Sequence, residues 1–115
     1  YLKSIYFMKI MMERKNILID IDGTVSEDIP NEESNRFGSA YVLENAVQSV
    51  NKLFERGHSI TFFTARQENY REVTLKWLTD HGFKFHIDRW VRAEGLNVIR
   101  RNAKRSISSV KVLSR

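Results

Sequence analysis

The stretch Asp20-Ile21-Asp22-Gly23-Thr24 places two carboxylates one residue apart at the end of an apolar run. A carboxylate inside such a run is costly unless it is compensated, and two carboxylates this close repel each other without a cation or proton between them. A Mg²⁺ ion bound by one or two carboxylates and a substrate phosphate would remove both costs. The alternative is ordinary turn chemistry, because aspartate before glycine is common in turns. We favour a catalytic pair with Mg²⁺ as cofactor.

The element that must position this pair is a strand. Residues Ile17–Ile21 are rich in branched apolar side chains and are followed by Asp-Gly, which predicts a short buried strand that ends in a tight turn. Buried strands of this kind belong to parallel sheets covered by helices. Such sheets place their chemistry just beyond the carboxyl ends of the strands.

The motif Asp20-Ile21-Asp22-Gly23-Thr24 resembles the first motif of the haloacid dehalogenase superfamily of phosphatases and phosphotransferases. The resemblance implies that Asp20 is the nucleophile, which forms an aspartyl-phosphate, and also a metal ligand. It implies that Asp22 is the general acid/base and that its backbone carbonyl helps to hold Mg²⁺. Gly23 and Thr24 are assigned to phosphate binding.

A second motif of the same superfamily matches the next predicted strand. Residues Ser59–Phe63 predict a strand, and it ends in Thr64-Ala65-Arg66. The superfamily has a Ser or Thr at this place that bonds the transferring phosphoryl group, so the resemblance assigns Thr64 to phosphate binding. Simple β-propensity is the alternative for a threonine here. Arg66 is a candidate charged donor to a substrate phosphate.

The remaining pattern up to residue 88 predicts a Rossmann-like α/β fold. Apolar residues repeat at helical spacing over Leu43–Phe54, with Gly57 as a stop, and over Tyr70–Leu78, closed by Gly82. The alternation in Phe83–Ile87 predicts a third strand. The resulting βαβαβ order is the first half of a three-layer sandwich with a mainly parallel sheet, truncated at the C-terminus if the tail does not continue it.

Residues 26–40 form a polar stretch that takes the place of a cap domain. It is too short to be one, so the resemblance is to minimal-cap members, whose open sites accept small phosphorylated substrates and also larger ones. Its acids could suggest a second metal site, but a solvated active-site loop is the favoured interpretation; these acids are Glu27, Asp28, Glu32 and Glu33.

Composition limits the class of protein. The chain has 115 residues, of which 42% are hydrophobic and 29% charged, and no cysteine. This predicts one soluble globular domain without a disulfide framework. No apolar run approaches the roughly 20 residues that span a bilayer. We therefore expect a cytoplasmic protein with no membrane partner. The oligomeric state stays open.

The positive charge of the chain is confined to its C-terminal part. Residues 1–88 carry 11 Lys+Arg against 13 Asp+Glu, a balance of −2, whereas residues 89–115 carry 8 against 1, a balance of +7. The tail lacks the interleaved aromatic residues that stack on bases, so nucleic acid is disfavoured as a partner. We divide the chain into an N-terminal extension (1–14), a core (15–88) and a basic tail (89–115).

The third and fourth motifs of the superfamily, a lysine and a pair of acids, are not identifiable in the tail. Its first lysine is Lys104, and no strand followed by paired acids occurs there. The tail is interpreted as a genuine anion-binding extension, as a solvated end, or as out-of-frame sequence, of which the last is favoured. Residues Ser106–Leu113 could supply a makeshift strand.

The predicted function is a Mg²⁺-dependent phosphomonoester hydrolase that acts through an aspartyl-phosphate. The alternative is a catalytically impaired protein of the same fold, either truncated or frameshifted, or a non-enzymatic anion-binding domain. A receiver-like phospho-acceptor domain ranks lower, because it would need its phosphorylated aspartate at the end of a later strand than the one that carries Asp20.

Overall fold

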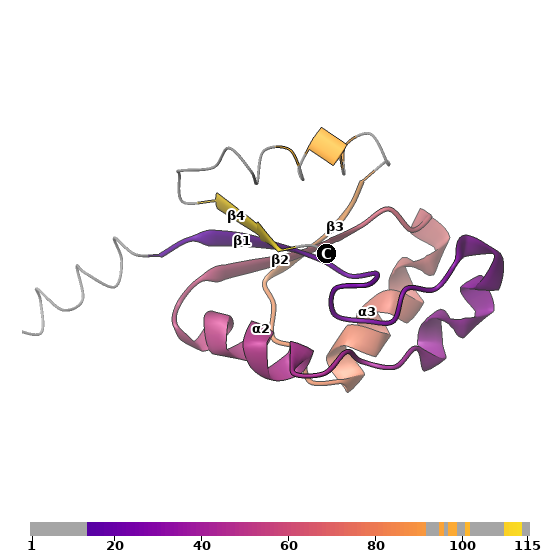
Figure 1. Ribbon diagram of the computed structural model, residues 1–115, viewed down its shortest axis with the longest axis horizontal. Helices are drawn as coiled ribbons and strands as arrows, with labels where there is room; N and C mark the ends of the chain where they lie inside the picture. The colour runs from indigo at the N-terminus through magenta and orange to yellow at the C-terminus, as the bar shows by residue number, and fades with distance from the viewer. Residues whose placement is uncertain (1–13, 92–94, 96, 99–100, 102–109, 114–115) are drawn as a thin grey trace, which may run out of the picture.

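Four parallel strands form the sheet at the centre of the protein (Figure 1). The computed structural model describes residues 14–91, 95, 97–98, 101 and 110–113. The strands are β1 (Asn16–Asp20), β2 (Ser59–Thr64), β3 (Ile87–Trp90) and β4 (Val110–Leu113), in the spatial order β3-β2-β1-β4. Every neighbouring pair is parallel. The predicted α/β class with a mainly parallel sheet is therefore confirmed.

The two described α-helices, α2 (Ala46–Glu55) and α3 (Arg71–Asp80), lie on the same side of this sheet (Figure 1). On the other face, the described residues 95, 97–98 and 101 have helical backbone. Gly57 follows α2 with a φ of +91°, a left-handed conformation that favours glycine, as the predicted helix stop requires. None of the described helices is long and apolar enough to cross a membrane.

Two short 3₁₀ segments connect strands to helices. They are η1 (Asn31–Ser39), in the predicted cap-replacing stretch, and η2 (Glu68–Tyr70), directly before α3. η1 packs against α3. Gly38 allows this close approach, because a Cβ at that position would lie 3.2 Å from a methyl group of Val73.

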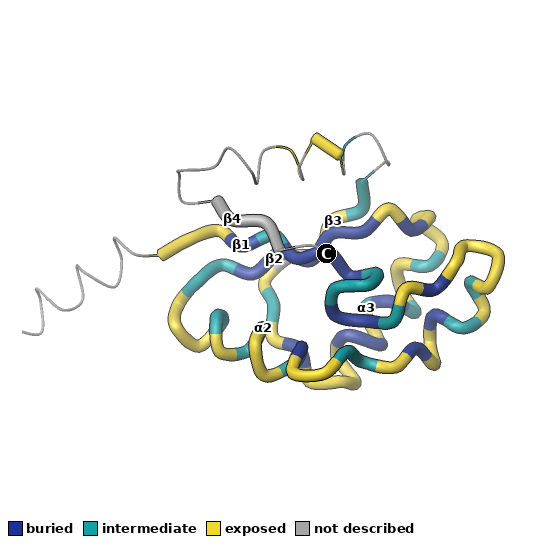
Figure 2. The backbone as a smooth tube through the Cα atoms, in the orientation of Figure 1, coloured by how far each residue is buried: buried dark blue, intermediate teal, exposed yellow. Residues whose placement is uncertain are grey.

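The core lies between the sheet and the helices α2 and α3. Burial is concentrated along β1 and β2 and on the inner sides of the helices (Figure 2). The apolar residues of this cluster include Ile17, Ile19, Ile60, Phe62 and Leu78. At the carboxyl end of β2, the last three residues are all buried. Because successive residues of a strand point to opposite faces, this end of the sheet is covered on both faces. Asp20 lies at the same end of the neighbouring strand β1.

The predicted third strand was wrong in its position. The pattern Phe83–Ile87 predicted a strand there, but β3 begins only at Ile87. Phe83 and Phe85 instead pack edge-on against Phe62, with ring centroids 5.6 and 5.3 Å apart. The alternation thus comes from two aromatic side chains that an irregular segment directs into the core.

The C-terminal part of the chain contributes to the sheet. β4 lies beside β1, with Asn16 opposite Val110 and Ile19 opposite Leu113. The strand predicted within Ser106–Leu113 is therefore confirmed over its last four residues. The predicted extension 1–14, apart from Arg14, lies outside the described residues, as does Lys104.

Candidate active site

Asp20 is the last residue of β1, the strand that lies between β2 and β4 in the sheet. It pairs in register with Phe63 of β2, and its neighbours Ile19 and Ile21 are buried. Only 2% of Asp20 is exposed. A carboxylate this deeply buried is retained in a fold only when its charge is compensated, which makes the group a candidate for chemistry.

A tight turn after β1 places Asp22. The backbone N–H groups of Thr24, Val25 and Ser26 all donate to the carbonyl of Ile21, over 3.1–3.2 Å. Gly23 has a φ of +75°, which the turn requires and which glycine adopts without strain. The hydroxyl oxygen of Thr24 is buried and has no hydrogen-bond partner within the part of the chain described.

The end of β2 contacts Asp22. The hydroxyl of Thr64 donates to Asp22 Oδ2 over 3.2 Å and accepts a bond from the backbone N–H of Arg66 over 3.2 Å. Thr64 is fully buried. The structure therefore brings the two predicted motifs together at one edge of the sheet, although its bonds do not test the predicted roles of these residues.

Arg66 is the cation of the site, and its side chain faces Asp22. Its Nε donates to Asp22 Oδ1 over 3.0 Å and lies 3.3 Å from Oδ2, and its Nη2 donates to Oδ1 over 2.7 Å. Its Nη1 donates to Thr74 Oγ1 over 2.9 Å. Only 3% of the side chain is exposed, whereas 23% of the Asp22 side chain is. Direct binding of a substrate phosphate by Arg66 stays a prediction.

Two neighbours of Arg66 were not predicted as site residues. The guanidinium carbon lies 3.9 Å from the ring centroid of Phe37 in η1, a cation–π contact. Thr74 accepts from Arg66 and donates to the carbonyl of Tyr70 over 2.7 Å. Thr74 could have been noticed in the sequence, because it is a polar residue on the apolar stripe of a predicted helix. The sequence offered no such signal for Phe37, because its stretch was predicted as a polar loop.

A second ion pair fastens the start of β3 to the start of α3. Arg71 Nη1 contacts Glu68 over 3.0 Å, and its Nη2 lies 2.6 Å from Asp88 Oδ2. The pKa of Arg71 is raised, first by the hydrogen bond to Glu68 and then by that to Asp88. Arg71 also lies over the ring of Trp90. Asp88 is thus committed to a structural contact.

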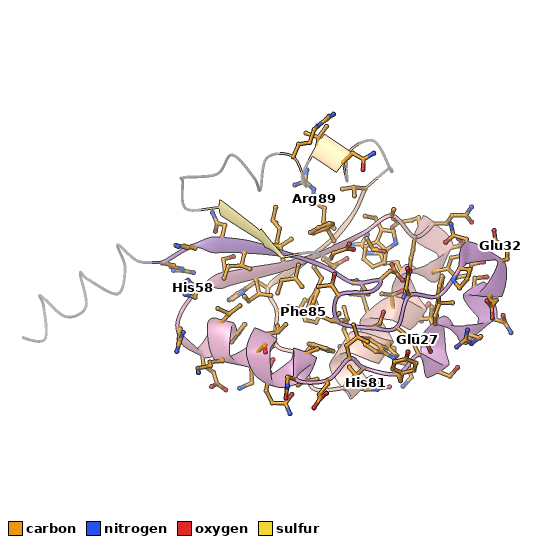
Figure 3. All side chains as sticks on the ribbon, in the orientation of Figure 1. Glu27, Glu32, His58, His81, Phe85 and Arg89 are labelled. Carbon is orange, nitrogen blue, oxygen red and sulfur yellow. The ribbon has the colours of Figure 1, made fainter. Side chains whose placement is uncertain are left out.

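The acids of the 26–40 stretch do not gather around a metal. Glu27 accepts bonds from Arg36 over 2.9 Å and from the backbone of Tyr41 over 3.3 Å, and Glu32 lies on η1 (Figure 3). Hydrogen bonds to Glu33 and then Glu27 raise the pKa of Arg36. Among the described residues, no three acidic, histidine or cysteine side chains cluster as metal ligands.

The three histidines belong to no metal-ligand cluster among the described residues. The ring of His86 accepts a bond from the backbone N–H of Ile60 over 3.1 Å and stacks on Phe54. His58 lies next to the start of β2 and His81 follows α3, far apart in Figure 3. The backbone N–H of Lys15 donates to the ring of His58, which ties the start of β1 to the loop before β2.

A family comparison identifies the chain. The family model described as the LNS2 domain of PITM 1-3 matches residues 17–114. The chain belongs to this LNS2-domain family. The match begins in β1 and runs past β4, so it includes most of the basic tail, and this counts against out-of-frame sequence as the origin of the tail.

One curated relative and two solved structures are also similar. A putative nucleotidase of Bacillus cereus is 42% identical over 45 residues, which are 39% of this chain and 24% of that protein. A chain of the Pnkp1/Rnl/Hen1 RNA repair complex superposes with a TM-score of 0.63 at 18% identity, over 86% of this chain and 34% of that one. D,D-heptose 1,7-bisphosphate phosphatase from Burkholderia thailandensis gives 0.54 at 13% identity, over 88% and 66%.

At these identities the two structures show a shared fold alone, the α/β architecture of haloacid dehalogenase-type proteins. This LNS2-family chain spans about a quarter of the curated relative and about a third of the RNA repair chain.

Proposed function

We propose that the protein is a phosphomonoester hydrolase that uses Asp20 as its nucleophile. The observation that supports this most is a buried carboxylate, Asp20, at the end of β1, followed two residues later by a second carboxylate, Asp22, that Thr64 and Arg66 hold from the end of β2. Fold similarity to a phosphatase and sequence similarity to a putative nucleotidase point the same way.

The reaction would run in two steps. A carboxylate oxygen of Asp20 attacks phosphorus, the bond from phosphorus to the leaving oxygen breaks, and that oxygen takes a proton from Asp22. Asp22 then accepts a proton from water, whose oxygen attacks the aspartyl-phosphate and releases inorganic phosphate and the Asp20 carboxylate. The Thr24 hydroxyl, which lacks a partner among the described residues, is a candidate donor to a phosphoryl oxygen. The N–H of Gly23 already donates to the carbonyl of Ser26 over 2.9 Å.

The donor set fits Mg²⁺ in part. Mg²⁺ is commonly held by one or two protein oxygens, with water and a substrate phosphate completing the shell. The Asp20 carboxylate and the backbone carbonyl of Asp22 would be those ligands, since the Asp22 carboxylate is bonded to Arg66. When bound, the ion would neutralise charge on the phosphoryl group. Small phosphorylated molecules are the expected substrates, and a cytoplasmic location remains a prediction.

A catalytically impaired, anion-binding domain is the second candidate function. The observation in its favour is that the described residues supply no third acid beside Asp20 and Asp22. Without such a group, Mg²⁺ would be held weakly and turnover would be low.

Hydrolysis of p-nitrophenyl phosphate with and without Mg²⁺ tests the proposal. We expect Mg²⁺-dependent release of p-nitrophenol that falls by about 10³-fold or more in Asp20→Asn, because the substitution removes the nucleophile and leaves the shape of the side chain. The control is Asp80→Asn, at an exposed position in α3 whose carboxylate pairs with Lys76. A folded wild type without turnover would favour the impaired alternative.

A further inference from the structure

The guanidinium of Arg66 is enclosed on several sides at once. The Asp22 carboxylate lies at its Nε and Nη2, Thr74 at its Nη1, and the ring of Phe37 over its plane. Planar bidentate geometry of this kind fixes direction as well as charge. The side chain is only 3% exposed. A substrate phosphate in solvent therefore has little access to the guanidinium.

The two oxygens of Asp22 are held unequally. Oδ1 accepts the two shorter bonds from Arg66, at 2.7 and 3.0 Å. Oδ2 has only the longer contacts, 3.2 Å from the Thr64 hydroxyl and 3.3 Å from Arg66 Nε. Arg66 therefore anchors Oδ1 by the shorter bonds, and Oδ2 is the less tightly held of the two oxygens.

We propose that Arg66 is a positioning residue that acts through Asp22 and not on the substrate. It anchors Oδ1 and so fixes the direction of the Asp22 carboxylate, the proposed acid, while Phe37 and Thr74 hold Arg66 in the orientation that does so. This inference rests on the proposed function and assigns within it a role different from phosphate binding.

The arrangement also gives η1 a part in the reaction. Phe37 belongs to η1, and its ring lies edge-on to Tyr70 with centroids 5.1 Å apart. The Tyr70 hydroxyl bonds to Ser34, also in η1, over 2.8 Å. The short segment in the place of a cap thus braces Arg66, the residue that orients the acid.

Leaving groups of different acidity test the proposal. A poor alkoxide leaving group needs a proton from the acid, whereas p-nitrophenolate leaves readily without one. We expect Arg66→Gln to lower the rate of leaving-group release in a single turnover, which reports the first step alone, by about 10²-fold or more on an alkyl phosphate and by less than about tenfold on p-nitrophenyl phosphate. Arg66→Lys should recover only part of the loss, since an ammonium group cannot form the two-pronged contact.

Asp22→Asn should show the same split between the two substrates. Combining it with Arg66→Gln should cause little further loss, because residues that act as a unit are not additive. Phe37→Leu should give a smaller difference between the losses on the two substrates, in the same direction. If Arg66→Gln does not fold, this variant tests the positioning role in its place. The matched control is Arg56→Gln, an exposed arginine that follows α2, which should leave both rates unchanged.

Equal losses on the two substrates, or a raised KM for both at unchanged kcat, would overturn the positioning role and favour direct contact with the phosphate. Losses that multiply in the double variant would overturn it as well. A wild type that hydrolyses neither substrate would instead contradict the proposed function, and the positioning role would fall with it.

Discussion

Asp22 is the residue around which the candidate site is built. Thr64 and Arg66 both donate to its carboxylate, and they come from a strand end more than 40 positions away in the chain. Hydrogen bonds to a charged group contribute about 1.5–3 kcal/mol each, roughly twice the value of neutral ones. The orientation of this one carboxylate is therefore the property most sensitive to substitution at the site.

Thr64 should matter through its hydroxyl. Thr64→Val keeps the shape of the side chain but removes the donor to Asp22 and leaves the backbone N–H of Arg66 without its acceptor. We expect kcat to fall by about 10- to 100-fold, measured as phosphate release. Thr64→Ser should stay close to wild type. Thr79→Val, at an exposed position of α3, serves as the control, and full activity of Thr64→Val would contradict this role.

The elements that carry the site are fastened to one another by buried polar contacts as well as by packing. Trp77 of α3 donates from Nε1 to the carbonyl of Ala40, just after η1, over 2.8 Å. The same ring stacks on Phe83 with centroids 5.7 Å apart. Trp77 thus joins α3 to the end of η1 and to the segment before β3. Phe37 belongs to η1, so these contacts help to hold it in place.

Trp77→Phe should lower the free energy of unfolding by about 1–3 kcal/mol, because it leaves a buried carbonyl without its donor. Urea denaturation followed by circular dichroism measures the change. Trp90→Phe is the matched control, since the Nε1 of Trp90 has no hydrogen-bond partner in the described part of the chain. A loss of equal size in the two variants would show that ring volume, and not the hydrogen bond, decides the cost.

At the scale of the whole molecule, the sheet depends on the end of the chain. β4 pairs with the whole length of β1 except Asp20. Without it β1 would become an exposed edge, and an exposed apolar edge invites pairing with another chain. The basic segment thus has a structural role that its charge does not reveal.

Deletion of residues 106–115 should lower the free energy of unfolding by about 2–4 kcal/mol, the value of a few lost strand–strand hydrogen bonds. It should also cause concentration-dependent self-association on size-exclusion chromatography. The control Lys111→Gln/Arg115→Gln removes the same two charges but keeps the strand. A deletion variant as stable and monomeric as this control would contradict a structural role for β4.

Residues at the ends of parallel strands could be placed from the sequence alone. Asp20 and Thr64 each follow a short apolar run, and parallel strands that neighbour each other bring such ends together. The pairing of Arg66 with Asp22 could not be predicted in this way. The direction of the Arg66 side chain depends on Phe37 and Thr74, which lie in other elements. Local pattern carries no information about such contacts.

The third strand shows the opposite failure. Phe83–Ile87 has the alternation of a strand, yet its aromatic residues satisfy the core from an irregular segment and the strand begins where the pattern ends. Alternation reports which side chains face the core and not whether the backbone pairs. The fourth strand was only weakly indicated, since its segment lacks the acids that were expected after it.

The most direct test of the proposed chemistry is covalent trapping of the intermediate. Wild-type protein would be mixed with a phosphomonoester and Mg²⁺, quenched with borohydride, which reduces an acyl phosphate to an alcohol, and mapped by peptide mass spectrometry. The account predicts a reduced side chain at Asp20 that is absent without substrate and absent from Asp20→Asn. Phosphate release with no reduced residue, or reduction at a different carboxylate such as Asp22, would contradict it.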